Sequence, residues 1–262
     1  MTPCANTFSK NMHRFHLAPE LWDSATLDPS ESHHCLNVLR LAEGDRVTVF
    51  DGLGREAEAL IASRSGSRVV LKISQTSKIP PPPCAITLAQ AVPKGKNMDL
   101  IVQKSVELGA ARVAPLLSDR TVVQLDAADI ARKREKWQAV ALEACKQCGQ
   151  NHLPEISAPV PAKDFLERLG KNSLLLIASL QPDARPIKRV LAEYSAHHNG
   201  PPREVTVLVG PEGDFTPAEI ALAKSHGCQP VTLGPIILRT ETAAIYCLSV
   251  LAHELFIPLE AS

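Results

Sequence analysis

The sequence has 262 residues, and its 28 Lys and Arg residues balance 28 Asp and Glu residues, which gives a formal net charge of zero. Hydrophobic residues make up 45% and charged residues 21%, proportions typical of a globular chain and not of a disordered or fibrous one. No apolar run approaches the roughly 20 residues that a membrane-spanning helix needs, and the first residues lack the pattern of a secretory signal. The cytoplasm is therefore the expected location, and any surface that binds nucleic acid must be a local basic face.

The N-terminal part of the chain is predicted to be a small β-rich domain. Residues 1–11 have no periodicity and are expected to form a disordered extension. From residue 12 to 79, polar and apolar residues alternate in several short runs, as in strands with one buried face. Consecutive prolines begin at Pro80 and indicate a stiff linker over 80–84. The expected strands are 46–50, 56–61 and 67–73, with a turn at 51–54 and a short helix at 32–40.

Residues 85–262 are predicted to form a second domain, of the α/β class. Short apolar and β-branched runs alternate with segments of helical periodicity, the pattern of a parallel sheet covered by helices. In such a sheet, ligands bind beyond the carboxyl ends of the strands. The expected strands are 85–92, 111–117, 173–178, 205–209 and 231–233, and the expected helices are 98–108, 129–146, 165–169, 187–194, 217–227 and 243–256.

Two glycine-containing loops follow the last two expected strands. The glycines of the first loop, 210–215, allow positive φ, and because they lack a Cβ a ligand can approach the backbone closely. Thr216 and Glu219 are spaced as the capping box of the next helix. The second loop, 233–244, contains the apolar run 236–238. Apolar side chains in a loop need something to pack against, such as a bound ring or a threaded backbone.

The sequence offers little support for a metal or redox site. Cys145 and Cys148 form a C-x-x-C pair among 7 cysteines, but a redox or zinc site would require a second pair or a suitable fold around them. We favour the simpler interpretation that both lie on one turn of a helix. His33 and His34 lack carboxylates or cysteines at a matching spacing, so no metal site is predicted.

Four segments together resemble the RsmE family of SPOUT RNA methyltransferases. They are QAVPKGKNMDLIVQKSVELG, EACKQCGQNHLPEI, GPEGDF and LGPIILRTETA, and the resemblance extends from about Met12 to Phe256. It implies that residues 85–262 form an α/β trefoil-knot domain that binds S-adenosylmethionine, and that residues 12–79 form a small β-barrel similar to a PUA domain. It also implies a homodimer that methylates N3 of a uridine in small-subunit (16S) ribosomal RNA, as free RNA or in the 30S particle.

The resemblance also implies roles for particular residues. Three loops would hold the cofactor through backbone groups and apolar side chains; the alternative is that these are core and turn residues. Basic and amide side chains would contact RNA; the alternative is that they are solvated or structural. The cofactor-binding candidates are Leu176, Ile177, Gly210, Pro211, Glu212, Gly213, Leu233, Leu238 and Thr240, and the RNA-binding candidates are Arg14, Arg40, Lys94, Lys96 and Asn151.

The chemistry at uridine N3 requires that its proton leave. A general base, or a cation that stabilises the resulting anion, would lower the barrier. Arg239 and Glu241 lie on the second glycine loop and are candidates for these two roles. Glu241 is equally well placed to cap the last helix together with Thr240 or Thr242. Arg120, at the carboxyl end of an expected strand, is a candidate for binding the target nucleotide.

The sequence departs from the family pattern near these loops. Asp214 replaces a glycine, Ile236 replaces an arginine, and Gln150 replaces an arginine that could contact RNA. Two alternatives therefore stay open: an RNA-binding or ribosome-assembly protein with a vestigial methyltransferase fold, and a methyltransferase that acts on another RNA. A Rossmann-type methyltransferase is disfavoured because the sequence contains no G-x-G-x-x-G motif.

Overall fold

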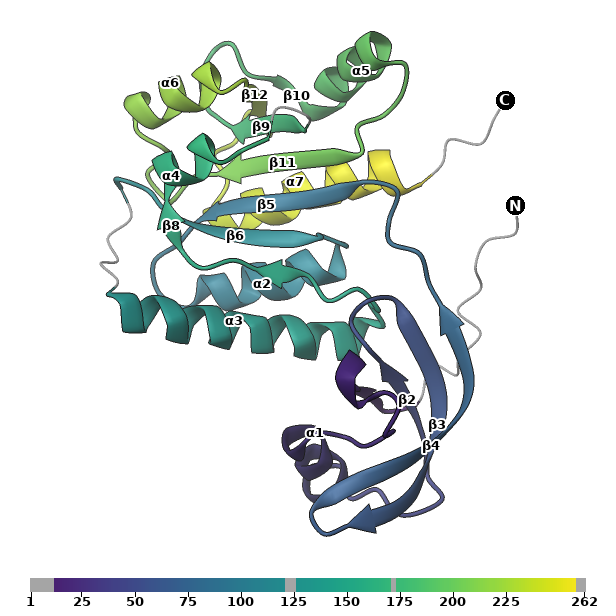
Figure 1. Cartoon of the computed structure of the whole chain (residues 1–262). Helices are drawn as coiled ribbons and strands as arrows, with labels where there is room; N and C mark the ends of the chain where they lie inside the picture. The colour runs from purple at the N-terminus through teal and green to yellow at the C-terminus, as the bar shows by residue number, and fades with distance from the viewer. Residues whose placement is uncertain (1–11, 121–125, 171–172, 258–262) are drawn as a thin grey trace. The chain divides into compact units, whose positions relative to one another are not determined.

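The chain divides into two compact units (Figure 1). A computed structural model describes residues 12–120, 126–170 and 173–257, so the expected extension lies outside the described residues. The division after Pro81 falls in the proline-rich segment, but the inclusion of 145–153 in the first unit has no signal in the sequence. Unit 1 contains the chain up to Pro81 together with Cys145–Leu153, and unit 2 contains Pro82–Ala144 and Pro154–Ser262.

Unit 1 is built on a four-stranded sheet in the order β1-β2-β3-β4 (Figure 1). β1 runs parallel to β2, and the other neighbouring strands are antiparallel. The predicted β-rich fold is confirmed, although β1 was not among the expected strands and the helix expected at 32–40 is replaced by two shorter turns of helix. The elements are β1 (Arg14–His16), η1 (Pro19–Leu21), α1 (Pro29–His33), the π-helical η2 (His34–Val38), β2 (Arg46–Phe50), β3 (Arg55–Ser65) and β4 (Arg68–Lys78).

The segment 145–153 is joined to unit 1 by backbone and side-chain bonds. Gly54 N donates to Asn151 O at 3.0 Å, and Leu153 N donates to Gly52 O at 2.9 Å. Lys146 Nζ lies 2.6 Å from the buried carboxylate of Glu31. These bonds explain why a segment so distant in sequence belongs to the same compact unit.

A buried ionic cluster reinforces this junction. Glu56 on β3 is fully buried and forms an ion pair with Arg14 of β1, whose side chain is only 13% exposed. Arg14 Nη2 also donates to the Asn151 amide oxygen at 2.6 Å, and its guanidinium lies 4.9 Å from the centroid of the Phe50 ring. A buried cation of this kind is held by its carboxylate partner and by the ring face.

The C-x-x-C pair lies within the helix α3 (Ala127–Cys148), as the sequence analysis favoured. Cys145 is buried and Cys148 is exposed, and neither forms a disulfide. Burial, with a smaller contribution from the neighbouring Cys148, raises the pKa of the Cys145 thiol to about 12. The thiolate is the reactive form of cysteine, so Cys145 is an inert core residue. Across the described part of the chain, no three His, Cys, Asp or Glu side chains are grouped as metal ligands.

The difference in exposure between Cys145 and Cys148 predicts a difference in their reactivity. Iodoacetamide should modify Cys148 of the native protein at pH 8 while Cys145 stays unmodified, because only Cys148 is accessible and only an ionised thiol reacts quickly. Mass spectrometry of the peptide that contains both cysteines measures the two positions separately. Equal modification of both in the folded protein would contradict the buried placement of Cys145, and denatured protein provides the control.

Unit 2 contains a parallel sheet in the order β10-β12-β9-β11-β5-β6-β7, with β8 also paired to β6. Every pair of neighbouring strands is parallel, which confirms the predicted α/β class. β9, β11 and β12 are neighbours, so their carboxyl ends meet at one edge. The strands are β5 (Ala85–Ala91), β6 (Arg112–Leu117), β7 (Glu155–Ile156), β8 (Val160–Pro161), β9 (Leu174–Ala178), β10 (Arg185–Pro186), β11 (Glu204–Val209) and β12 (Gln229–Thr232).

Helices cover the sheet of unit 2. α7 packs against α2, α5, β5 and β11, whereas α4 packs against α6. α6 begins with the predicted capping box, in which Glu219 N donates to Thr216 Oγ1 at 3.2 Å and Thr216 N donates to the Glu219 carboxylate at 2.8 Å. None of the helices in the described ranges is both long and apolar enough to span a bilayer. The remaining helices are α2 (Asn97–Glu107), α4 (Ala162–Glu167), α5 (Ile187–His198), α6 (Pro217–Ser225) and α7 (Thr240–Phe256).

Candidate functional site

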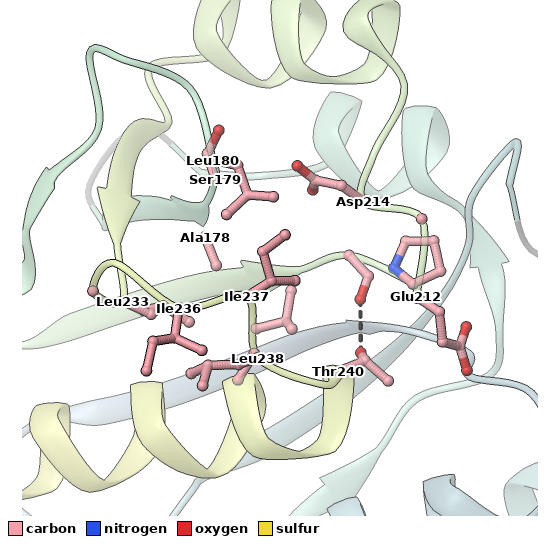
Figure 2. Close-up of a pocket in the computed structure, with 16 residues that line it drawn as sticks. Ala178, Ser179, Leu180, Glu212, Asp214, Leu233, Ile236, Ile237, Leu238 and Thr240 are labelled. Carbon is pink, nitrogen blue, oxygen red and sulfur yellow. Dashed lines mark hydrogen bonds between the residues drawn. The ribbon is translucent and has the colours of Figure 1, made fainter.

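A cavity opens at the edge of the unit 2 sheet where β9, β11 and β12 end (Figure 2). Its volume is about 250 Å³ and its mouth is open to solvent, so it suits a small molecule that is partly exposed. Three segments line it: 178–180 after β9, 209–214 after β11, and several residues between 233 and 243 after β12. These are the edge and the loops at which the sequence predicts a ligand.

The lining combines apolar side chains with backbone groups. Leu180, Ile236 and Ile237 are 63%, 73% and 77% exposed, so they form an apolar surface that is available to a ligand. Figure 2 shows Ile236 and Ile237 on the loop after β12, with Leu180 on the opposite side. Among the described lining residues, only Glu212 and Asp214 carry a charge, and both are acidic. This cavity therefore suits a ligand with a flat apolar part and a positive charge.

The glycines of the first loop do not adopt the positive φ that glycine allows. Neither Gly210 nor Gly213 adopts a positive φ, and the left-handed residue is Asp214, at φ 62°. Gly210 lies close to the next turn of the loop, because a Cβ at this position would lie 3.0 Å from Asp214 Oδ1 and 3.1 Å from the Phe215 nitrogen. The loop therefore folds back onto Gly210, and a larger residue would require these atoms to shift.

A buried hydrogen-bonded chain connects three segments around the cavity. Gln90, at the end of β5, is fully buried and donates from Nε2 to Thr240 Oγ1 at 2.9 Å and to Ala91 O at 2.9 Å. Thr240 Oγ1 in turn donates to Gly210 O at 2.7 Å, as the dashed line in Figure 2 shows. Thr240 is the first residue of α7 and is 4% exposed. The chain therefore fixes the start of α7 against the loop after β11.

Replacement of Thr240 by valine should weaken both folding and ligand binding. Valine has nearly the same shape but removes the donor to Gly210 O and one of the two acceptors of Gln90 Nε2, which keeps its bond to Ala91 O, so we expect a loss of about 1–3 kcal/mol in the free energy of unfolding. Urea denaturation measures this loss. Thr240→Ser keeps the hydroxyl and is the matched control. Equal destabilisation by serine and valine would show that the methyl group, and not the hydrogen-bonded chain, is what matters.

The loop after β6 is joined to the same region. The guanidinium of Arg120 donates to Gly213 O. Ser118 Oγ and Asp119 N donate to the Glu219 carboxylate at 3.2 Å and 3.0 Å. Arg120 is exposed, so its side chain is available at the boundary of the cavity loops even though one of its donors is already used.

Two lysines lie on the loop between β5 and α2. Lys94 N donates to Glu212 Oε1 at 3.0 Å, which fixes this loop beside the loop that lines the cavity. Lys94 and Lys96 are both exposed.

In unit 1, Arg40 is exposed as well, with a left-handed φ of 56°. By contrast, the contacts of Arg14 described above favour a structural role over one in RNA contact, and the same holds for Asn151, which is 3% exposed.

Arg239 and Glu241 flank the first residue of α7. Arg239 is the N-cap residue and is exposed, but its side chain makes no capping bond. Glu241 lies in the first turn, where a carboxylate stabilises the helix dipole without a direct cap. The alternative in which Glu241 caps α7 by a hydrogen bond is therefore not seen. Within the described residues, neither side chain forms a hydrogen bond or an ion pair, so both are available to a substrate.

Most of the predicted cofactor residues line the cavity, but two do not. Leu176 and Ile177 are 0% and 1% exposed within β9, and Ile177 packs in the core beneath α4 and α6. The first residue of this region that lines the cavity is Ala178, directly after Ile177. It is followed by Ser179 and Leu180 of the loop after β9. The predicted residues that line the cavity are Gly210, Pro211, Glu212, Gly213, Leu233, Leu238 and Thr240.

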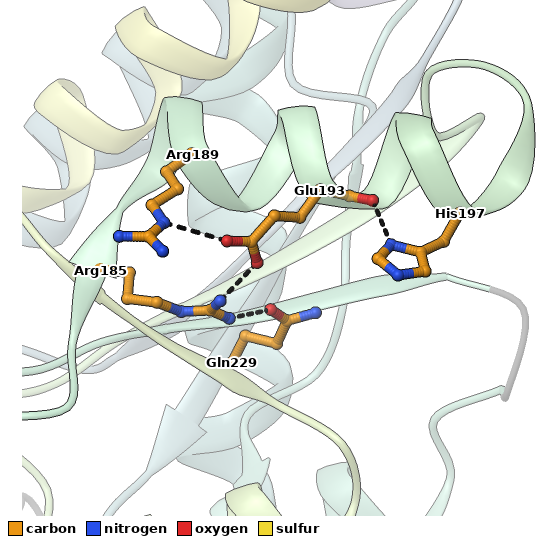
Figure 3. Close-up of polar contacts among 5 residues, drawn as sticks. All are labelled: Arg185, Arg189, Glu193, His197 and Gln229. Carbon is orange, nitrogen blue, oxygen red and sulfur yellow. Dashed lines mark hydrogen bonds and ion pairs between the residues drawn. The ribbon is translucent and has the colours of Figure 1, made fainter.

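A cluster of polar residues anchors the far end of the loop that follows β9 (Figure 3). Arg185 on β10 forms an ion pair with Glu193 of α5 and donates to Gln229 Oε1 of β12 at 2.6 Å. Arg189 Nε donates to Glu193 at 3.0 Å. The hydrogen bond from Arg189, together with the charge of Arg185, holds the pKa of the Glu193 carboxyl below its usual range. The cluster is half-exposed, and its place in the fold indicates that it holds the loop in position.

The class of this protein follows from the fold, the cavity and two family models. Residues 80–252 match the model of an RNA methyltransferase domain, and residues 27–74 match that of an RNA methyltransferase PUA domain. The first match covers the parallel sheet and the loops of the cavity, and the second falls within the β-rich N-terminal unit. Fold and site thus define an RNA methyltransferase with an N-terminal PUA domain.

Known relatives identify the family within that class. The ribosomal RNA small subunit methyltransferase E of Bacillus subtilis (strain 168) is 32% identical over 227 residues, which cover 86% of this chain and 88% of that protein. The same enzyme of Synechocystis sp. is 32% identical and is matched over 90% of this chain and 76% of its own length. A crystal structure of ribosomal RNA small subunit methyltransferase E from Neisseria gonorrhoeae, bound to S-adenosyl methionine, is 30% identical with a TM-score of 0.80, and the match covers 93% of this chain and 98% of that one.

The chain belongs to the RsmE family of small-subunit ribosomal RNA methyltransferases. Membership confirms the resemblance found in the sequence, and with it the SPOUT-like class of the α/β domain and the PUA-like character of the N-terminal domain.

Proposed function

We propose that this protein transfers a methyl group from S-adenosylmethionine to N3 of a uridine in small-subunit ribosomal RNA. The observation that carries the proposal is the cavity at the carboxyl edge of the unit 2 sheet, with Arg239 and Glu241 beside it and without an ion-pair partner among the described residues. The reaction would take place in the cytoplasm, where small ribosomal subunits are assembled.

The residues present fit this cofactor. The cavity is large enough for it, its exposed leucine and isoleucines offer an apolar surface to an adenine ring, and its two acidic side chains suit a positively charged ligand. When bound, S-adenosylmethionine supplies an activated methyl group on a positively charged sulfur. The protein's own contribution is to orient the ligand through the three loops, which the chain from Gln90 through Thr240 to Gly210 holds together.

Arg239 and Glu241 carry the two groups that loss of the uridine N3 proton requires, a cation and a proton acceptor. Loss of the N3 proton places negative charge on the base, and an unpaired guanidinium beside the cavity stabilises that charge. Glu241 is the candidate that accepts the proton, because no described side chain neutralises its carboxylate. Arg120 lies at the same edge, and we assign it to the target nucleotide. Lys94, Lys96 and Arg40 would contact RNA phosphates, as exposed cations on two units of a chain with no net charge.

The functional form is proposed to be a homodimer that uses α7. Tyr246 is 43% exposed on this helix, and it lines a shallow groove with Ile245 and Val250. An apolar helix face of this kind is a suitable contact for a second copy of the chain. Analytical ultracentrifugation at micromolar concentration tests this part separately, and a monomer would contradict it.

Transfer of labelled methyl groups tests the proposed reaction. The protein is incubated with labelled S-adenosylmethionine and either small or large ribosomal subunits that lack native methylation. Label should enter the small-subunit RNA only. Cofactor binding without transfer to either subunit would indicate another RNA substrate, whereas absence of cofactor binding would favour a vestigial methyltransferase fold.

A further inference from the structure

Asp214 occupies an unusual position in the cavity. Its carboxylate is one of the two charged groups in the described lining, and its backbone lies in the left-handed region at φ 62°. A non-glycine residue in that region is uncommon, and aspartate tolerates it because its short side chain bonds to the nearby backbone. Here Asp214 Oδ1 accepts a hydrogen bond from Phe215 N at 2.7 Å, which fixes the carboxylate on the loop.

We propose that Asp214 is a specificity residue that makes this protein prefer the positively charged methyl donor to its neutral demethylated product. The inference rests on the proposed function, because it takes S-adenosylmethionine as the ligand of the cavity. Methyl transfer converts the donor's sulfonium cation into a neutral thioether. Donor and product otherwise differ by a single methyl group, so a fixed negative charge is a means of distinguishing them.

The surroundings of Asp214 leave its charge available. Within the described residues, it forms no ion pair, and its second carboxylate oxygen accepts no hydrogen bond. The nearby guanidinium of Arg120 bonds to Gly213 O and not to Asp214. Figure 2 shows the Asp214 side chain extending from its loop in the direction of Leu180, across the upper part of the cavity. Any ligand in the cavity therefore lies within the field of this carboxylate.

Glu212, the other acidic residue of the lining, is less suited to distinguish the charged donor from the neutral product. Glu212 is exposed, and one of its oxygens accepts the hydrogen bond from Lys94 N. Its role is accounted for by the attachment of the neighbouring loop, and water screens its charge more effectively. Asp214 is half-buried, so its field in the cavity is screened less. Even with the full screening of bulk water, two unit charges about 4 Å apart interact strongly enough for about a fivefold change in affinity, and we take this lower value because the cavity is open to solvent.

Binding measurements on the full-length protein test the inference without any RNA. Isothermal titration gives the Kd of S-adenosylmethionine and of S-adenosylhomocysteine for the wild type and for Asp214→Asn, which keeps the size of the side chain. The variant should bind the donor about fivefold more weakly and the product with unchanged affinity. Asp214→Gly, which accepts the left-handed backbone, should give the same change in the ratio of the two constants.

A remote charge provides the control. Glu155 is an exposed carboxylate on β7, the edge strand of unit 2 farthest from β9 and β12; it pairs with Arg112 and does not line the cavity, so Glu155→Gln should leave the ratio of the two constants as in the wild type. An unchanged ratio in both Asp214 variants, or an equal loss of affinity for both ligands, would overturn the inference. Failure of the wild type to bind S-adenosylmethionine would instead contradict the proposed function.

Discussion

Replacement of Arg239 by alanine should reduce the rate of methyl transfer by about 100-fold or more, while the Kd of S-adenosylmethionine stays near its wild-type value. Arg239 precedes α7, is exposed and makes no capping bond, so its removal does not disturb the helix. It is also absent from the lining of the cavity, although the adjacent Leu238 and Thr240 belong to it. The proposed function therefore assigns its side chain to the substrate and not to the cofactor.

Single-turnover kinetics measure the effect of the Arg239 variants on the rate of methyl transfer, and equilibrium binding measures their effect on the Kd of S-adenosylmethionine. Arg239→Lys keeps the charge but loses the planar donor fork, and we expect it to recover only part of the rate. If Arg239→Ala weakened cofactor binding by the same factor as it slowed transfer, Arg239 would be a part of the cofactor site and the assignment to the uridine would be wrong.

Replacement of Glu56 by alanine should destabilise unit 1 strongly. It leaves the guanidinium of Arg14 almost buried without a carboxylate, and the loss of one partner from a buried ion pair costs about 3–5 kcal/mol. The free energy of unfolding, measured with guanidinium chloride, should fall by about that amount. The loss should be smaller in the double variant Glu56→Leu with Arg14→Met, in which neither charge remains.

Measurements of stability and of RNA binding on an Arg14 variant distinguish a structural role from a role in RNA contact. If Arg14 is structural, as its bonds to Glu56 and Asn151 indicate, Arg14→Met should lower stability and should affect RNA binding only through unfolding. If it contacts RNA phosphates, the variant should keep its stability and lose affinity for RNA together with part of the salt dependence. Arg40→Met is the matched variant at an exposed arginine of the same unit, and it should show the second pattern.

The sequence predicts the longer elements of unit 2 well, because their patterns are local, but it does not predict the two-residue strands β7, β8 and β10. The buried strand at 205–209 and the capping box of Thr216 and Glu219 are found where the sequence places them. Residues 32–40 were less predictable, since a helical pattern there does not distinguish one α-helix from a short α-helix followed by a π-helical turn.

The site shows the limits of local patterns more clearly. The three loops were predicted, but nothing in the sequence shows that the left-handed residue of the first is Asp214 and not one of its glycines. Nothing in the sequence relates Gln90 to Thr240, because their bond joins residues 150 positions apart. Likewise, Arg14 reads as a surface cation until its partners on β3 and at Asn151 are known. Pairings between distant segments are set by the tertiary fold and leave no periodic trace.

Identification of the methylated nucleoside tests the central claim most directly. Unmethylated small ribosomal subunits are incubated with the protein and S-adenosylmethionine, and the RNA is then digested to nucleosides for mass spectrometry against authentic standards. The proposed function predicts one new N3-methyluridine per subunit with the wild type and little or none with Arg239→Ala. A product methylated at a different atom or on a different base would contradict it.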